Sequence, residues 1–209
     1  MRDPEDEGAL TASVSSRVMP GAIILVNGAS SAGKSTLCRA LQARMETSFW
    51  HYSIDHFRGQ VLPWERIKSH EFEWAALRPA FFDGFHRCLP GLALAGNDLI
   101  VEHIIETGRW MSDLVRLLDA FDVYFVGLHC PLEELERRER ARGDRPLGDA
   151  RRDFESIHRH CTYDLELDST ARLGDNVEAV FDGWRRRGHP SAFERMKASG
   201  RIQVGQPAP

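Results

Sequence analysis

The chain has few cysteines, no long apolar run and no excess of basic residues, and each absence excludes a class of protein. Its four cysteines, Cys38, Cys88, Cys130 and Cys161, are far apart and form no CxxC pair. This spacing argues against a zinc site or a disulfide framework and is typical of reduced thiols in a cytosolic protein. The net charge of -4 argues against a general nucleic-acid binder, which is usually basic.

Long apolar segments are missing as well. No stretch approaches the ~20 apolar residues that a membrane-spanning helix needs, and residues 1–18 lack the apolar core of a signal peptide. We therefore expect a cytoplasmic protein that contacts no membrane. The 209 residues, of which 42% are hydrophobic and 28% charged, suit one globular domain.

Segments with strand-like and helix-like patterns alternate along the chain. An unbroken apolar run at 22–27 predicts a strand buried on both faces. Further strands are predicted at 50–54, 99–105, 123–129 and 163–168, and helices at 35–45, 71–95 with a break at Pro90-Gly91, 108–119, 131–142, 149–160 and 176–187. The alternation is typical of an α/β protein, whose parallel sheet has helices on both faces and binds ligands beyond the carboxyl ends of its strands.

A phosphate-binding loop follows the first strand directly, since residues 28–35 match G-x-x-x-x-G-K-[ST] at every fixed position. The glycines let backbone N–H groups wrap around phosphate oxygens, and the next helix offers its positive N-terminal end. Lys34 can reach the β- and γ-phosphates of ATP, and Ser35 can ligate Mg²⁺. The predicted nucleotide-binding residues are Gly28, Ala29, Ser30, Ser31, Ala32, Gly33, Lys34, Ser35 and Thr36.

The loop in this setting predicts a fold of the P-loop nucleoside-triphosphate-hydrolase type, similar to the nucleotide kinases. We expect the P-loop kinase domain to span residues 21–187. Residues 1–20 are predicted to be a flexible N-terminal tail, and residues 188–209 a C-terminal tail.

Asp55 follows the second predicted strand. A carboxylate there would face the phosphate loop and could accept or orient the proton of an attacking hydroxyl. Asp is also favoured as the N-cap of a helix. The residue pattern leaves both interpretations open.

Glu102 lies inside the apolar strand predicted at 99–105. An unpaired buried charge is costly, so a magnesium ion bound directly or through water would account for this acid. The alternative is that the strand is exposed on one side. His103 should point to the opposite face and is predicted to be a hydrogen-bonded structural histidine.

The helix predicted at 131–142 begins with acids and ends with bases, which suits ion pairs four residues apart and the helix dipole. Leu135, Arg138 and Arg142 form a separate stripe with i, i+3, i+7 spacing. Because two arginines there continue the line of a core residue, we expect them, with Arg145 in the following loop, to form a lid over the transferring phosphoryl group. The alternative is a fully solvated helix.

These segments together resemble the chloramphenicol phosphotransferase family of small P-loop kinases. The matching residues are 27–35, Asp55, 126–130, 138–145 and 163–168, so the resemblance covers about residues 22 to 185. It implies ATP-dependent phosphorylation of a hydroxyl, with Asp55 as general base and Lys34, Ser35, Arg138, Arg142 and Arg145 around the phosphates. Chloramphenicol is one candidate acceptor, which leaves a role in antibiotic resistance or in metabolism open. The family can carry two adjacent acids where this chain has Glu102-His103, so the magnesium arrangement stays open.

The acceptor pocket is expected within residues 56–96, which show no clear match to the family. Aromatic residues are frequent there, and some could line a site for an aromatic or amphipathic acceptor while others belong to the core; they are Phe57, Trp64, Phe72, Trp74, Phe81, Phe82 and Phe85.

Rival functions remain at this stage. A GTPase switch is disfavoured because the chain has neither N-K-x-D nor D-x-x-G. A kinase of a nucleotide, a sugar or an activated amino sugar would share the same loop, base and lid. A regulatory module that binds a nucleotide without transfer would not need Asp55 or the inward arginines. The sequence does not determine the oligomeric state, and a homo-oligomer remains one of the alternatives.

Overall fold

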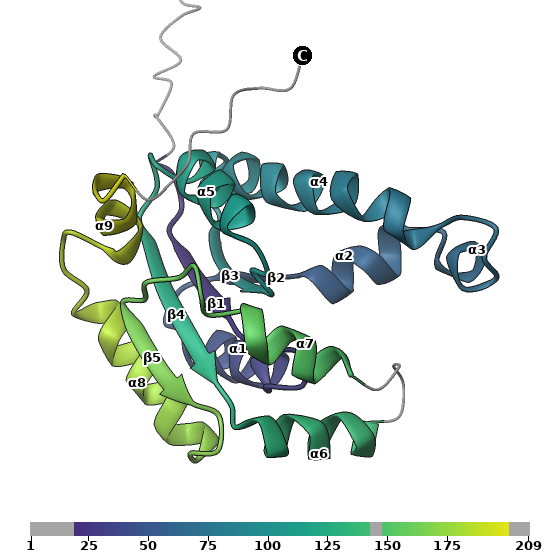
Figure 1. Ribbon diagram of the computed structural model, residues 1–209. Helices are drawn as coiled ribbons and strands as arrows, with labels where there is room; N and C mark the ends of the chain where they lie inside the picture. Colours follow the sequence, from purple (N-terminus) through teal and green to yellow (C-terminus); the bar gives the residue numbers. More distant parts are fainter. Residues whose placement is uncertain (1–18, 143–147, 201–209) are drawn as a thin grey trace, which may run out of the picture.

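A five-stranded parallel sheet forms the centre of the protein (Figure 1). The computed structural model describes residues 19–142 and 148–200. The strands β1 (Ile23–Asn27), β2 (Phe49–Ser53), β3 (Asp98–His103), β4 (Val123–His129) and β5 (Leu165–Asp168) lie in the order β2-β3-β1-β4-β5, and every pair is parallel. The predicted α/β class is confirmed, and the apolar run at 22–27 is the central strand.

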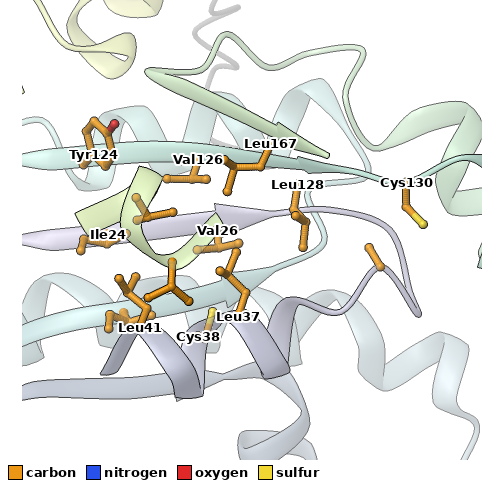
Figure 2. Packing of buried hydrophobic residues seen from close by; sticks show 14 of the residues in the cluster. Ile24, Val26, Leu37, Cys38, Leu41, Tyr124, Val126, Leu128, Cys130 and Leu167 are labelled. Atoms are coloured by element: carbon orange, nitrogen blue, oxygen red, sulfur yellow. The ribbon is translucent and has the colours of Figure 1, made fainter. Parts of the chain in front are cut away.

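Helices cover both faces of this sheet because successive side chains of a strand point in opposite directions. On one face, Ile24 and Val26 of β1 pack with Leu37 and Leu41 of α1 (Lys34–Arg44), and α8 (Leu173–Arg185) completes that layer. Figure 2 shows this cluster between β1 and α1. On the other face lie α4 (Trp74–Leu94), α5 (Gly108–Leu117) and α9 (Ala192–Ala198).

Helix α4 runs without interruption through Pro79 and Pro90, so the break expected at Pro90-Gly91 is wrong. A proline inside a helix removes one backbone hydrogen bond and costs about 3 kcal/mol. Burial of Phe85 and Leu89 on the sheet offsets that cost, since both side chains are fully buried. Packing of α4 on the sheet thus outweighs the local effect of its prolines.

Two short helices precede α4 that the residue pattern did not predict, α2 (Ile54–Val61) and α3 (Trp64–Lys68). Helix α2 begins directly at the carboxyl end of β2, where the Ser53 side chain accepts a hydrogen bond from the Asp55 amide. Together with α4 they form the arm that extends from the sheet in Figure 1.

Helix α9 lies within residues 188–209, which were expected to be a C-terminal tail, so that expectation is wrong for this segment. Ser191 and Glu194 form a capping box at its start. Phe193 and Met196 are buried against the sheet, and the Ala192 amide donates to Asp164 at 2.6 Å. Residues 1–18 and 201–209, also predicted as tails, lie outside the described residues.

Helices α6 (Leu132–Arg142) and α7 (Asp149–Ser156) extend beyond the carboxyl end of β4 and pack against each other. They frame the same end of the sheet as the loop between β1 and α1 (Figure 1). Among the described residues, no helix is both long and apolar enough to cross a lipid bilayer.

Candidate active site

The phosphate loop joins β1 to α1, and the backbone at Gly28 and Gly33 accommodates only glycine without strain. A Cβ atom on Gly28 would lie 2.7 Å from the Leu128 carbonyl oxygen, closer than real contacts allow. Gly33 has a φ of 94°, in the left-handed region that favours glycine. Helix α1 then begins at Lys34, so its first backbone N–H groups are available to an anion at this end of the sheet.

The Lys34 side chain lies back along its own loop. Its Nζ donates to the carbonyl oxygens of Gly28 at 2.9 Å and Ala29 at 2.8 Å. Burial lowers the pKa of Lys34 below its ordinary value, and the nearby acids, Glu102 first among them, oppose this shift. A half-buried ammonium group beside the loop is suited to bind phosphate oxygens.

Glu102 is 5% exposed, so the alternative of a strand open on one side is wrong. Its Oε1 accepts hydrogen bonds from Ser53 Oγ and from Ser35 Oγ, the latter at 3.1 Å. Its Oε2 is buried and has no hydrogen-bond partner among the described residues. A serine hydroxyl beside a carboxylate with a spare oxygen fits Mg²⁺, which prefers oxygen ligands.

Asp55 lies in the first turn of α2 and lines the same cleft as Lys34 and Glu102. The N-cap of α2 is Ser53, so the interpretation of Asp55 as a helix cap is wrong. Its side chain is 40% exposed, and its Oδ1 is 3.5 Å from the Arg58 guanidinium. The carboxylate is therefore reachable from the cleft.

Arg138 joins α6 to the phosphate loop. Its guanidinium donates to Glu134 at 2.6 Å, to the Ala32 carbonyl at 3.1 Å and to the Ser169 carbonyl at 3.2 Å. Arg142 is exposed and lines the same cleft. Arg145 lies outside the described residues.

The stripe predicted on α6 thus runs from the core into the cleft: Leu135 is fully buried, Arg138 is half-buried and Arg142 is exposed. The fully solvated alternative is wrong for Arg138.

Asp153 on α7 is a member of the site that sequence reasoning missed. It is 1% exposed, and its Oδ2 accepts a hydrogen bond from the Ser30 amide of the phosphate loop at 2.9 Å. Ala150, Asp153 and Ile157 share one helical stripe, and both apolar members are fully buried. A charged residue on an otherwise apolar helical stripe could have identified Asp153 from the sequence, just as it identified Arg138.

His103 points to the opposite face from Glu102, as predicted, and is hydrogen-bonded. Its Nδ1 accepts from the Ile104 amide at 2.7 Å, and its Nε2 is 2.6 Å from His86 Nε2. Burial lowers the pKa of His86 to about 4 and that of His103 well below its ordinary value. Both rings are therefore neutral. Because Nδ1 of His103 accepts a hydrogen bond, the ring proton of His103 is on Nε2, and this N–H donates to Nε2 of His86.

One cleft of ≈ 1340 Å³ collects the phosphate loop, Asp55, Glu102, Arg138 and Arg142. Its far wall is aromatic, as the sequence anticipated for part of residues 56–96: Trp64, Trp74, Phe81 and Phe82 line it. Phe85 belongs to the core instead, and Phe72 lies beneath the Arg66 guanidinium. The cleft therefore has a phosphate-binding end and an aromatic end, with Asp55 among its lining residues.

Comparison with known proteins supports the resemblance seen in the sequence. A family model described as "Chloramphenicol phosphotransferase-like protein" matches residues 21–181. Proteins from two strains of Mycobacterium tuberculosis, CDC 1551 / Oshkosh and ATCC 25618 / H37Rv, each named "Putative O-phosphotransferase", are 29% identical over 198 residues. Each alignment covers 85% of this chain and 88% of the relative.

Several solved structures have a similar fold. The APS kinase of Mycobacterium tuberculosis in complex with AMPPNP and APS has a TM-score of 0.62 at 17% identity, covering 79% of this chain and 98% of that chain. A gluconokinase from Sinorhizobium meliloti scores 0.56 at 17% identity over 81% and 94%. Shikimate kinase from Aquifex aeolicus scores 0.55 at 18% identity over 79% and 99%. The TM-scores and the coverage establish that this chain has the fold of these P-loop kinases.

Proposed function

The chain belongs to the chloramphenicol phosphotransferase-like family, and from this membership we propose that it transfers the γ-phosphoryl group of ATP to a hydroxyl of a small molecule. The observation that carries the proposal is the single cleft shared by Lys34 of the phosphate loop, the carboxylate of Asp55 and the guanidinium of Arg138. A nucleotide-binding module that performs no transfer would need the loop but not the other two groups.

In this reaction the acceptor oxygen forms a bond to the γ-phosphorus, the bond from that phosphorus to the β,γ-bridging oxygen breaks, and ADP leaves. Asp55 takes the proton of the acceptor hydroxyl. Lys34 and the loop amides hold the β- and γ-phosphates, and Arg138 and Arg142 stabilise the charge on the transferring group. Ser35 and Glu102 would hold Mg²⁺, which neutralises phosphate charge when bound.

The aromatic end of the cleft favours a planar or amphipathic acceptor. Trp64 and Trp74 pack edge to face with ring centroids 5.8 Å apart, and Trp74 and Phe81 at 5.5 Å. Arg78 stacks 4.7 Å above the Phe82 ring and pairs with Glu106 at 2.6 Å, which adds polar groups to this wall. Chloramphenicol or a related compound is one candidate. A nucleotide, a sugar or an activated amino sugar is the competing class.

The test is mass spectrometry of chloramphenicol and a panel of hydroxylated metabolites incubated with the protein, ATP and Mg²⁺. We expect one acceptor to gain a single phosphoryl group. Asp55→Asn should keep ATP affinity and lower kcat by at least ~100-fold, the usual contribution of a general base. Lys34→Ala should lose nucleotide binding.

Asp83→Asn is the matched control, since Asp83 is exposed on α4 and pairs with Arg87 outside the cleft. It should leave transfer unchanged. Unchanged transfer in Asp55→Asn would remove Asp55 as the base. ATP binding with no product from any acceptor would favour the regulatory module.

A further inference from the structure

Three potential metal ligands meet beneath the phosphate loop: Cys38 of α1, His51 of β2 and Glu102 of β3. One ligand atom of each lies within 4.8 Å of the other two. The strand register explains how they meet. Ser53 is paired with Glu102 in the sheet, and His51 is two residues earlier on β2, so His51 and Glu102 share the face covered by α1. Figure 2 shows Cys38 on that side of α1, facing β1.

Two atoms of this cluster have no satisfactory partner. His51 Nε2 and Glu102 Oε2 are buried and make no hydrogen bond to a described residue. His51 Nε2 lies 3.7 Å from Glu102 Oε1, which is too far for a hydrogen bond, although each side chain is only 6% exposed. Buried polar atoms are nearly always satisfied, so two unsatisfied atoms within one cluster of potential metal ligands indicate a missing ligand.

The donor types indicate which ion would fill the gap. A thiolate sulfur, an imidazole nitrogen and a carboxylate oxygen are each ligand types of Zn²⁺, and three protein ligands leave the fourth position of an open tetrahedral site for water. The neighbouring pair, Ser35 and Glu102, offers only oxygen, which suits Mg²⁺. Cys38 comes three residues after Ser35 on α1, so the sulfur and the hydroxyl lie on the same side of the helix, one turn apart.

We propose that Cys38, His51 and Glu102 form a Zn²⁺ site directly beneath the magnesium position and that the two positions share Glu102. When the Zn–S bond forms, the thiol proton of Cys38 passes to solvent. Glu102 lines the cleft, which provides the entry route. Because one carboxylate serves both positions, Zn²⁺ and the Mg²⁺–nucleotide complex compete, and zinc inhibits the enzyme. The inhibition rests on the proposed function, whereas the zinc site does not.

Cysteine spacing argued against a zinc site because sequence motifs detect ligands that are near each other in the chain. Here 12 residues lie between Cys38 and His51, and 50 residues lie between His51 and Glu102. The packing of α1, β2 and β3 brings these three residues together, and their spacing in the sequence does not predict it.

The binding test uses the full chain without nucleotide. Zn²⁺ affinity is measured by competition with a chromophoric chelator, and Co²⁺ is added separately to look for the thiolate-to-cobalt charge-transfer band. We expect one ion per chain. Losing a group that only hydrogen-bonds to a metal ligand already costs ~10–100-fold in affinity, so Cys38→Ser and His51→Gln should each weaken zinc by at least about 100-fold. Cys38→Ser should also abolish the cobalt band.

The controls are Cys88→Ser and His70→Gln, which change the same residue types at exposed positions. Both should bind zinc like the unaltered protein. No stoichiometric zinc, or equal losses in all four variants, would overturn the site. If Cys38→Ser does not fold, a zinc affinity of the folded His51→Gln protein at least about 100-fold below that of His70→Gln still supports the site, and equal affinity in these two variants overturns it.

The competition test repeats the zinc measurement at buffered free Zn²⁺ with saturating Mg²⁺ and AMPPNP. A shared Glu102 should weaken zinc affinity by about tenfold or more, whereas unchanged affinity would overturn the competition. This measurement needs no turnover. A confirmed zinc site in a protein that phosphorylates no acceptor would therefore count against the proposed function alone.

Discussion

At the scale of single residues, Asp153 connects the phosphate loop to α7. Its Oδ2 accepts the Ser30 amide at 2.9 Å, and its Oδ1 lies 3.2 Å from the exposed Arg152 guanidinium. The carboxylate therefore holds the backbone of the phosphate loop and lines the same cleft. We infer that it keeps the loop in the conformation that receives the nucleotide.

Replacing Asp153 should therefore weaken ATP binding. A hydrogen bond to a charged group contributes about 1.5–3 kcal/mol, so Asp153→Ala should raise the Kd for ATP by about tenfold to 100-fold. Asp153→Asn keeps an acceptor oxygen and should have a smaller effect. Isothermal titration with AMPPNP measures both. Equal affinity in Asp153→Ala and the unaltered protein would show that the Ser30 contact does not position the loop.

At the scale of elements, Glu139 joins the two helices that frame the cleft. It is 6% exposed on α6, and it accepts the amides of Gly148 at 3.0 Å and Ala150 at 2.9 Å at the start of α7. The Gly148 amide is the leading cause that lowers the pKa of Glu139. An acid from a neighbouring helix thus satisfies amides that a helix N-terminus leaves without partners.

Glu139→Ala should leave those two amides without acceptors. The expected loss of unfolding free energy is about 2–3 kcal/mol, and kcat should fall because Arg138 and Arg142 lie on the same helix. Urea denaturation and transfer kinetics measure the two effects. Glu133→Ala on the exposed face of α6 is the control and should change neither. A stable Glu139→Ala protein would mean that α6 and α7 do not depend on this acid.

The residue pattern predicted several elements with accuracy and missed others for a physical reason. The strand expected at 123–129 has those bounds as β4, because its apolar run needs no distant partner to be recognised. Helix α3 was missed because five residues are too few to show a helical period. Helix α2 was missed because it is only eight residues long, although Ile54, Phe57 and Val61 have helical spacing. The predicted break in α4 was wrong because fully buried Phe85 and Leu89 hold the helix on the sheet despite Pro90.

At the scale of the whole molecule, α9 completes the helix layer on the face of the sheet opposite α1. Phe193 is 4% exposed and packs edge to face on Phe125 of β4, with ring centroids 5.3 Å apart. Figure 1 shows α9 at the end of the molecule away from α6. We infer that residues 191–198 stabilise the folded domain and take no part in the chemistry.

Phe193→Ala should lower the unfolding free energy by about 3–5 kcal/mol, the usual cost of removing a buried ring. ATP affinity should be unchanged in the protein that remains folded. Lys197→Ala, on the exposed side of α9 where Lys197 pairs with Asp119, should cost no more than about 1 kcal/mol. Thermal and urea unfolding measure the unfolding free energy, and titration with AMPPNP measures nucleotide affinity. A loss below about 1 kcal/mol in Phe193→Ala would restore the tail interpretation.

The sequence by itself determined the phosphate loop, the alternation of strands and helices, and the family resemblance. These depend on local requirements, such as a glycine at Gly33 where φ is 94° and an apolar run long enough for a central strand. Only the tertiary structure decided that Glu102 is buried and that α9 belongs to the core. It also brought Asp153 to the loop and Cys38 to His51. The physical reason is that each of these depends on contacts between residues distant in the chain, which pattern and spacing do not encode.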